Sequence, residues 1–174
     1  MQLGELQIYN NALTTLPASV GKLARLTELD LQYCRITSLP DEIGDLPALT
    51  EISLRDNHLT ALPAAIARCP ALASIDLSDN PDLDLAGAFR ILAQVPSLRR
   101  LSLFSNKLTR LPDEIGLLTQ LEDLWLACAR PSKKTSWRLT TARGSGWYLP
   151  GWSFIARAII GRTPIPRSNT PGRP

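Results

Sequence analysis

Leucine-proline pairs recur along this chain at a nearly constant interval, and this period constrains the fold more than any other feature. Four such pairs at equivalent positions end at Pro17, Pro40, Pro63 and Pro112, so the first two intervals are 40 − 17 = 23 and 63 − 40 = 23 residues. The last interval is 112 − 63 = 49 residues, which fits one unit of 23 and one of 26. A period of this size, carried by leucines, indicates a solenoid of stacked units rather than a single globule.

Aligned on these pairs, the chain divides into similar units. The units span residues 3–25, 26–48, 49–71, 72–97 and 98–120, and a partial sixth unit spans 121–129. The third unit shows the spacing clearly, because only one or two other residues separate each of Leu49, Ile52, Leu54, Asn57 and Leu59 from the next. Because apolar residues at alternate positions share one face of a strand, each unit predicts one short strand. Stacking then predicts a parallel sheet with strands ~4.8 Å apart.

This pattern matches the consensus L-x-x-L-x-L-x-x-N/C-x-L of leucine-rich repeats. With its L-P-x-x-I-G-x-L second half, the chain resembles leucine-rich repeat proteins, most of all the 23-residue type of intracellular Ras-group proteins and their bacterial counterparts. The resemblance covers residues 3 to about 126. It implies an α/β fold, namely a right-handed, curved horseshoe segment with a parallel sheet on its concave face and short helices or turns on its convex face.

Two further features of the units predict local structure. The position after each strand holds Asn11, Cys34, Asn57, Asn80, Asn106 and Ala129. A buried amide there can bond loop backbone groups, whereas alanine cannot. Each Leu-Pro pair predicts a short helical turn with proline near its first position. The longer fourth unit predicts a longer helix after Asp84, which has an N-cap side chain.

Charge divides the chain into two parts. Residues 1–129 hold all 16 acids and 10 Lys or Arg, a net charge of 10 − 16 = −6, whereas residues 130–174 hold no acid and 9 Lys or Arg. We expect 1–129 to be the repeat domain and 130–174 to be a basic, Pro-, Gly- and Trp-containing tail that is irregular or disordered, with a short amphipathic helix at 153–160. Three interpretations of the tail stay open: a degraded or frame-shifted continuation of the repeats, an improvised cap on the last strand, or a basic, aromatic segment that binds a membrane surface or nucleic acid.

Several classes of protein find no support in the sequence. The chain opens directly with repeat residues, and no run of apolar residues reaches the ~20 needed to span a bilayer, so we expect a cytoplasmic protein. Three cysteines without paired spacing indicate neither a disulfide framework nor a metal site. Catalysis would depend on a Cys34–His58 pair without an oxyanion site, and phosphate-binding loops are absent. We therefore expect neither an enzyme nor a bound cofactor or small-molecule substrate.

The residues between the leucines of the sheet are the candidate binding surface. The residues predicted to contact a protein partner are Tyr9, Asp30, Gln32, Tyr33, Arg55, Asp56, Asp76, Arg100, Phe104 and Trp125. Exposed aromatic residues and arginine often anchor protein interfaces, and the surrounding acids favour a basic partner. The hypothesis is a protein-interaction module that binds through its concave face. The alternative is a truncated or frame-shifted remnant of a longer leucine-rich repeat protein with no function of its own.

Overall fold

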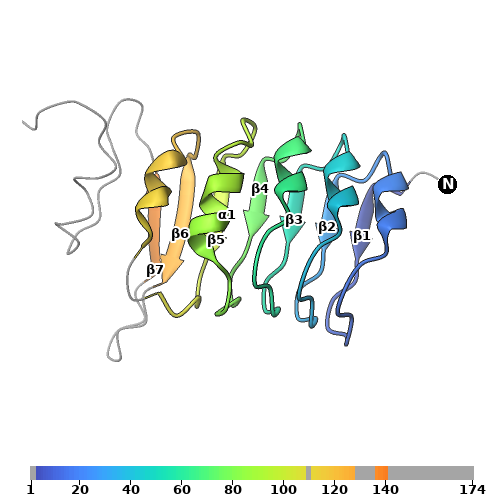
Figure 1. Cartoon of the computed structure of the whole chain (residues 1–174), viewed down its shortest axis with the longest axis horizontal. Helices are drawn as coiled ribbons and strands as arrows, with labels where there is room; N and C mark the ends of the chain where they lie inside the picture. Colours follow the sequence, from blue (N-terminus) through green and yellow to red (C-terminus); the bar gives the residue numbers. More distant parts are fainter. Residues whose placement is uncertain (1–2, 109–110, 128–135, 141–174) are drawn as a thin grey trace, which may run out of the picture.

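A computed structural model describes residues 3–108, 111–127 and 136–140 of the chain, and short strands alternate with short helices along it (Figure 1). The strands of the repeats are β1 (Glu5–Gln7), β2 (Glu28–Asp30), β3 (Glu51–Ser53), β4 (Ser74–Asp76), β5 (Arg100–Leu103) and β6 (Asp123–Ala127). Between them lie the 3₁₀ helices η1 (Ala18–Lys22), η2 (Asp41–Asp45), η3 (Ala64–Arg68) and η4 (Asp113–Leu117), and the α-helix α1 (Leu85–Leu92). The chain therefore repeats one strand and one helix per unit.

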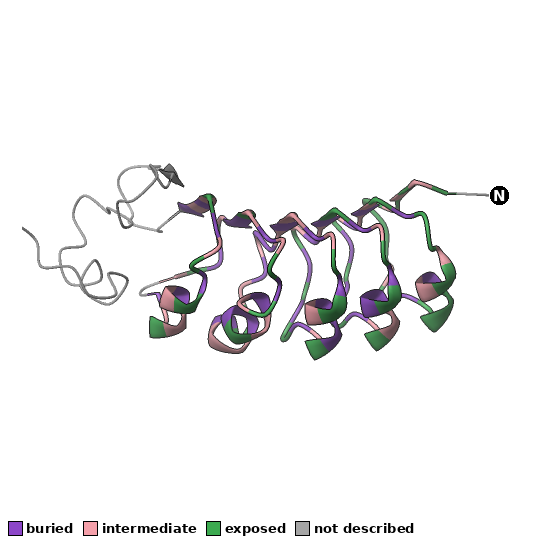
Figure 2. Cartoon of the chain, turned by 90° about the horizontal axis from the view of Figure 1, so that it is seen from above, coloured by how far each residue is buried: buried purple, intermediate pink, exposed green. Residues whose placement is uncertain are grey.

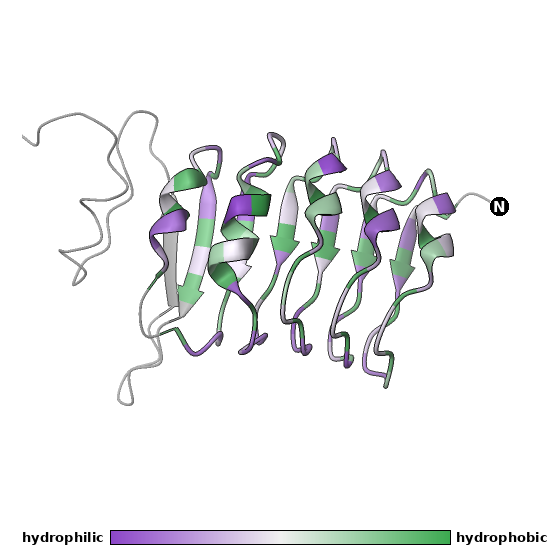
Figure 3. Ribbon diagram, viewed as in Figure 1, coloured by the Kyte–Doolittle hydropathy of each residue, from purple (hydrophilic) through white to green (hydrophobic). Residues whose placement is uncertain are grey.

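The six repeat strands pair in chain order and are all parallel, as the period predicts. The register joins equivalent positions: Leu6 lies beside Leu29, which lies beside Ile52. Seen from above, the strands form one side of the molecule and the helices the other, with buried residues between them (Figure 2). Colouring by hydropathy shows hydrophobic residues on both the strands and the helices, interspersed with hydrophilic ones (Figure 3). The leucine-rich repeat solenoid is thus confirmed.

The helices opposite the sheet begin directly after the prolines. Pro17, Pro40, Pro63 and Pro112 are extended and immediately precede η1 to η4, near the first helical position as predicted. Neighbouring turns approach closely, and a Cβ added at Gly44 would meet the backbone carbonyl of Ala65 inside van der Waals contact. In the fourth unit, the predicted longer helix is confirmed as α1. The Asp84 carboxylate accepts a hydrogen bond from the Gly87 N–H at 3.1 Å, as an N-cap does.

The buried asparagines after the strands bond backbone groups of neighbouring units, as predicted. The Oδ1 of Asn57 accepts from the Ile36 N–H at 2.8 Å, and its Nδ2 donates to the Leu31 carbonyl at 2.8 Å. Asn80 and Asn106 occupy equivalent buried positions. In place of an amide, the Cys34 thiol donates to the Ile8 carbonyl at 3.2 Å. Ala129 lies outside the described residues.

The prediction of an irregular tail is wrong for five residues. Ser136–Thr140 forms a seventh strand, β7, which pairs antiparallel with β6. A strand at the end of a sheet presents unpaired backbone groups, and a following segment of extended backbone can satisfy them. The other tail expectations, including the helix at 153–160, fall on residues outside the described part of the chain.

Candidate interaction surface

The face of the sheet that points away from the core is called the sheet face below. It consists of the residues between the buried leucines of each strand and of the residues that follow each strand up to the asparagine position. Along the stack, the first position of each strand holds Glu5, Glu28, Glu51, Ser74, Arg100 and Asp123. Short strands from neighbouring units therefore bring together residues about 23 positions apart in the chain.

Three glutamates lie side by side at the start of this surface. Glu5, Glu28 and Glu51 are register partners in β1, β2 and β3, so adjacent carboxylates stand on strands only ~4.8 Å apart. Partial burial, together with the charges of Glu5, Glu51 and Asp30, raises the pKa of Glu28. Like charges held close together raise a carboxyl pKa because ionisation becomes less favourable. This part of the surface consequently favours the approach of positive charge.

Two exposed tyrosines lie near the same end of the sheet face. Tyr9 is 60% exposed and Tyr33 is 46% exposed. Tyr33 has a φ of 55°, in the left-handed region. The equivalent residues are Asn10, Asp56, Asp79 and Ser105, all with φ between 53° and 58°. Asparagine and aspartate tolerate this conformation, whereas a bulky residue rarely adopts it. Tyr33 thus occupies a backbone position better suited to a short polar residue.

Two of the predicted contact residues help to build the turns. The Asp30 carboxylate accepts from the Gln32 N–H at 3.1 Å, and the Asp76 carboxylate accepts from the Ser78 N–H at 2.9 Å. Both aspartates and Gln32 are half-buried. The Asp30 and Asp76 carboxylates therefore stabilise the turn that follows each strand and also contribute negative charge. Asp56, in contrast, is exposed.

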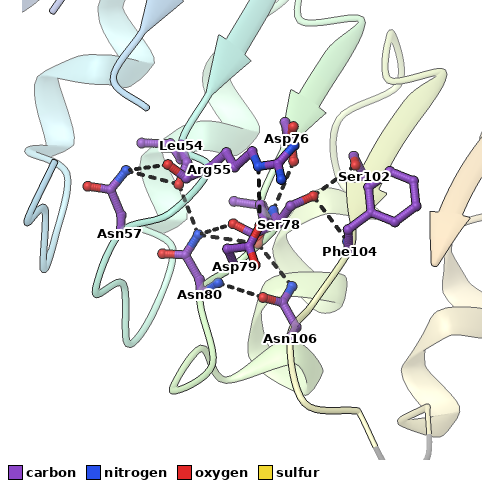
Figure 4. Close-up of polar contacts among 11 residues, drawn as sticks. Leu54, Arg55, Asn57, Asp76, Ser78, Asp79, Asn80, Ser102, Phe104 and Asn106 are labelled. Atoms are coloured by element: carbon purple, nitrogen blue, oxygen red, sulfur yellow. Dashed lines mark hydrogen bonds and ion pairs between the residues drawn. The ribbon is translucent and has the colours of Figure 1, made fainter. Parts of the chain in front are cut away.

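Arg55 lies within a polar cluster in the middle of the sheet face (Figure 4). Its Nε is 3.1 Å from Oδ2 of Asp79, and both side chains are only partly exposed. Beside this ion pair, the Oγ atoms of the buried Ser78 and Ser102 lie 2.9 Å apart, and Ser78 Oγ also accepts from the Phe104 N–H at 3.0 Å. Arg55 is consequently engaged within the protein, although a partner carboxylate can still reach its exposed part.

The remaining predicted residues lie toward the last repeats. Arg100 is exposed, with Ser74 and Asp123 as its register partners in the neighbouring strands. Phe104 and Trp125 are half-buried rather than exposed. Trp125 stands beside Ser102 in the sheet, and Phe104 follows the end of β5. The structure therefore places these two aromatic residues on adjacent units, while the more exposed Tyr9 and Tyr33 lie at the opposite end of the array.

The set of predicted contact residues omitted some that the structure places on the same surface. The glutamates of β1, β2 and β3 were left out, although aligning the repeats puts them in one column. The pairing of Arg55 with Asp79 and the burial of Ser78 against Ser102 have no signal in the repeat pattern. They depend on which side chains meet across neighbouring units.

Other kinds of site are not apparent in the described residues. Within 3–108, 111–127 and 136–140, no group of three or more His, Cys, Asp or Glu is placed to hold a metal ion. No helix of this part is long and apolar enough to cross a bilayer. Cys34 and Cys69 are buried free thiols, and burial raises the pKa of Cys69 to about 11. His58 is exposed in the loop after Asn57.

Comparison with known proteins agrees with this architecture. Two family models described as leucine rich repeat match residues 24–81 and 97–118. No curated protein sequence matches the chain significantly.

Solved structures of similar shape come from bacteria and from human. A leucine-rich repeat protein of Leptospira interrogans is 32% identical over 67% of this chain and 30% of its own, with a TM-score of 0.55. Internalin C2 of Listeria monocytogenes is 26% identical over 72% of this chain and 52% of its own, with a TM-score of 0.59. Human 5T4, the trophoblast glycoprotein, shares the fold at 23% identity over 71% of this chain and 58% of its own, with a TM-score of 0.52. The chain spans less than two thirds of each of these structures.

Proposed function

Because this chain is a leucine-rich repeat protein, we propose that it is a non-enzymatic interaction module that binds a protein partner through its sheet face. Proteins with this fold generally serve as scaffolds for protein interaction. Stacked repeats create a long continuous surface, and its side chains vary without disturbing the core beneath. The proposed partner is a protein with a basic segment.

The observation that carries the proposal is Tyr33. A tyrosine in the left-handed region costs about 1–2 kcal/mol relative to ordinary backbone, and asparagine or aspartate would reduce this cost. Tyr33 is 46% exposed, so a large part of its surface is available for contact with a partner. Tyrosine is frequent at binding hot spots because it offers a large contact area together with a hydroxyl group. We infer that Tyr33 contacts a partner.

Charge supports a basic partner. Glu5, Glu28 and Glu51 place three carboxylates in register beside Tyr9 and Tyr33. The Glu28 pKa is raised by partial burial and by repulsion from neighbouring carboxylates, and a lysine or arginine of a partner would relieve that repulsion. Electrostatic attraction of this kind speeds association and weakens as salt increases.

The test compares three forms of the full chain in affinity capture from cells that express it. The sheet-face variant carries Tyr9→Ser and Tyr33→Asn. The matched control carries Asp41→Asn and Asp113→Asn, two exposed residues of η2 and η4 on the opposite side. We expect proteins with basic segments to be held by the wild type and the control, and to be lost by the sheet-face variant.

Stability separates loss of contact from loss of fold. Tyr33→Asn suits the left-handed backbone, so we expect it to raise the free energy of unfolding by about 0.5–1 kcal/mol while it weakens binding. A variant that is more stable but binds less can only have lost a contact. Equal capture by all three forms would contradict binding through the tyrosine end of the sheet face.

A further inference from the structure

The net negative charge of the repeats lies on the sheet face. The charged residues of this face are Glu5, Glu28, Asp30, Glu51, Arg55, Asp56, Asp76, Asp79, Arg100 and Asp123. They are eight acids and two arginines, a net charge of 2 − 8 = −6, whereas the rest of residues 1–129 holds 16 − 8 = 8 acids and 10 − 2 = 8 Lys or Arg. On the helix side, Arg68 pairs with Asp45 at 3.2 Å, and Arg90 pairs with Glu114. Positive charge is therefore attracted to the sheet face rather than to the helix side.

A segment of opposite charge follows the last strand of the sheet. Residues 141–174 hold five arginines and no acid, a net charge of +5. The segment follows Thr140, which lies opposite Asp123 in the β6–β7 pair. Asp123 occupies the position that the three glutamates occupy in β1, β2 and β3. The basic segment thus begins at the end of the sheet where the parallel strands start and the glutamates lie.

This segment is long enough to reach the glutamates. β1 and β7 are the outer strands of the sheet, six strand spacings of ~4.8 Å apart, or ~29 Å in all. Arg157 follows Thr140 by 157 − 140 = 17 residues, which span up to ~56 Å when extended. Arg162, Arg167 and Arg173 follow later still. A segment joined to its own site acts at an effective concentration on the order of millimolar, which gives it an advantage over a separate molecule of equal affinity.

We propose that residues 157–173 bind the sheet face of their own chain, with their four arginines against the glutamates of β1, β2 and β3. Charge complementarity and reach identify this occupant. The sheet face of a second copy would instead bring like charge against like charge and be repelled. This contact goes beyond the proposed function because it needs no partner. One consequence rests on the proposed function: a basic partner of the same surface must displace the arginines, so the segment is autoinhibitory.

Paramagnetic broadening in NMR tests the contact in the full chain. A nitroxide is attached at Ser168→Cys in a Cys128→Ser background, because the other two cysteines are buried. At low salt we expect the Glu28 amide signal to be lost, whereas the Asp41 amide signal, from η2 on the opposite side, persists. Salt at about 1 M, which screens charges beyond ~3 Å, should restore the Glu28 signal. An unbroadened Glu28 signal at low salt, equal broadening of both amides, or broadening that requires high protein concentration would overturn the proposal.

Matched substitutions test whether charge holds the segment in place. The glutamine variant carries Arg157→Gln, Arg162→Gln, Arg167→Gln and Arg173→Gln, and the control carries lysine at the same four positions. With the same nitroxide, the glutamine variant should recover the Glu28 signal, whereas the lysine control should not. Loss of the Glu28 signal that survives the glutamine changes would contradict the charge pairing.

Affinity capture with the same variants, without the nitroxide, separates this proposal from the proposed function. Because its segment no longer competes, the glutamine variant should hold at least about tenfold more of a basic partner than the wild type, and the lysine control should match the wild type. Capture by no form, with Glu28 still broadened, would refute the proposed function and support the contact within the chain. Equal capture by the wild type and the glutamine variant, with Glu28 unbroadened, would refute that contact alone.

Discussion

Replacing Asn57 with alanine should destabilise the protein severely, and the structure permits an estimate of how much. Asn57 is 2% exposed, and its amide makes four hydrogen bonds to the backbone. Two of these partners keep another donor: the Leu54 carbonyl also accepts from Asn80 Nδ2, and the Arg55 carbonyl also accepts from the Tyr33 N–H. Truncation is therefore most costly at the two groups that rely on Asn57.

Those two groups are the Ile36 N–H and the Leu31 carbonyl, both in residues that are 0% exposed. A buried polar group left without a partner costs about 1–3 kcal/mol, so two such groups together cost about 2–6 kcal/mol. This is a large part of the ~5–15 kcal/mol by which a typical domain is stable. Asn57→Ala should consequently lower the midpoint of urea unfolding, followed by circular dichroism, far more than an average substitution.

Two matched variants identify the cause. Asn11→Ala removes an exposed residue of the same column whose side chain accepts one bond, from the Leu13 N–H at 2.7 Å, and should cost less than about 1 kcal/mol. Asn57→Cys should recover part of the loss, because the Cys34 thiol already donates to the Ile8 carbonyl at the equivalent place. A cost for Asn57→Ala no larger than that for Asn11→Ala would refute the reasoning.

Further measurements probe the packing and the charges. Gly44→Ala should cost about 1–3 kcal/mol of unfolding free energy because its Cβ meets the Ala65 carbonyl, whereas Gly4→Ala, which has only an ordinary contact at 4.0 Å, should be tolerated; equal effects in urea unfolding would contradict the close approach. Glu28 has a raised pKa, so its ionised form opposes folding, and wild-type stability from this group improves as pH falls through that pKa. Glu28→Gln should therefore raise the thermal midpoint at pH 7, and a gain of the same size at pH 3 would contradict this origin. The Cys69 thiol, with a pKa of about 11, should resist iodoacetamide at pH 8 until the protein unfolds, and peptide mapping that finds it alkylated in the native state would contradict its burial.

The repeat period by itself determined the strands, the core and the ladder of asparagines. Each unit contacts mainly its neighbours, so aligning Leu29 with Ile52 in the sequence also places them side by side in space. The sequence also predicted the helix after Asp84, because an N-cap residue and apolar spacing are local properties of the chain. It also aligned the sheet-face residues in columns, although the glutamate column was not among the residues predicted to bind.

Only the tertiary structure decided which polar side chains pair across units and how far the aromatic residues are exposed. Arg55 meets Asp79 and Ser78 meets Ser102 because of the directions of individual side chains, which a period does not specify. The repeat period likewise does not predict the pairing of 136–140 with β6. Its cause is the unpaired edge that the last repeat leaves, and such an edge exists only once the repeats before it have stacked.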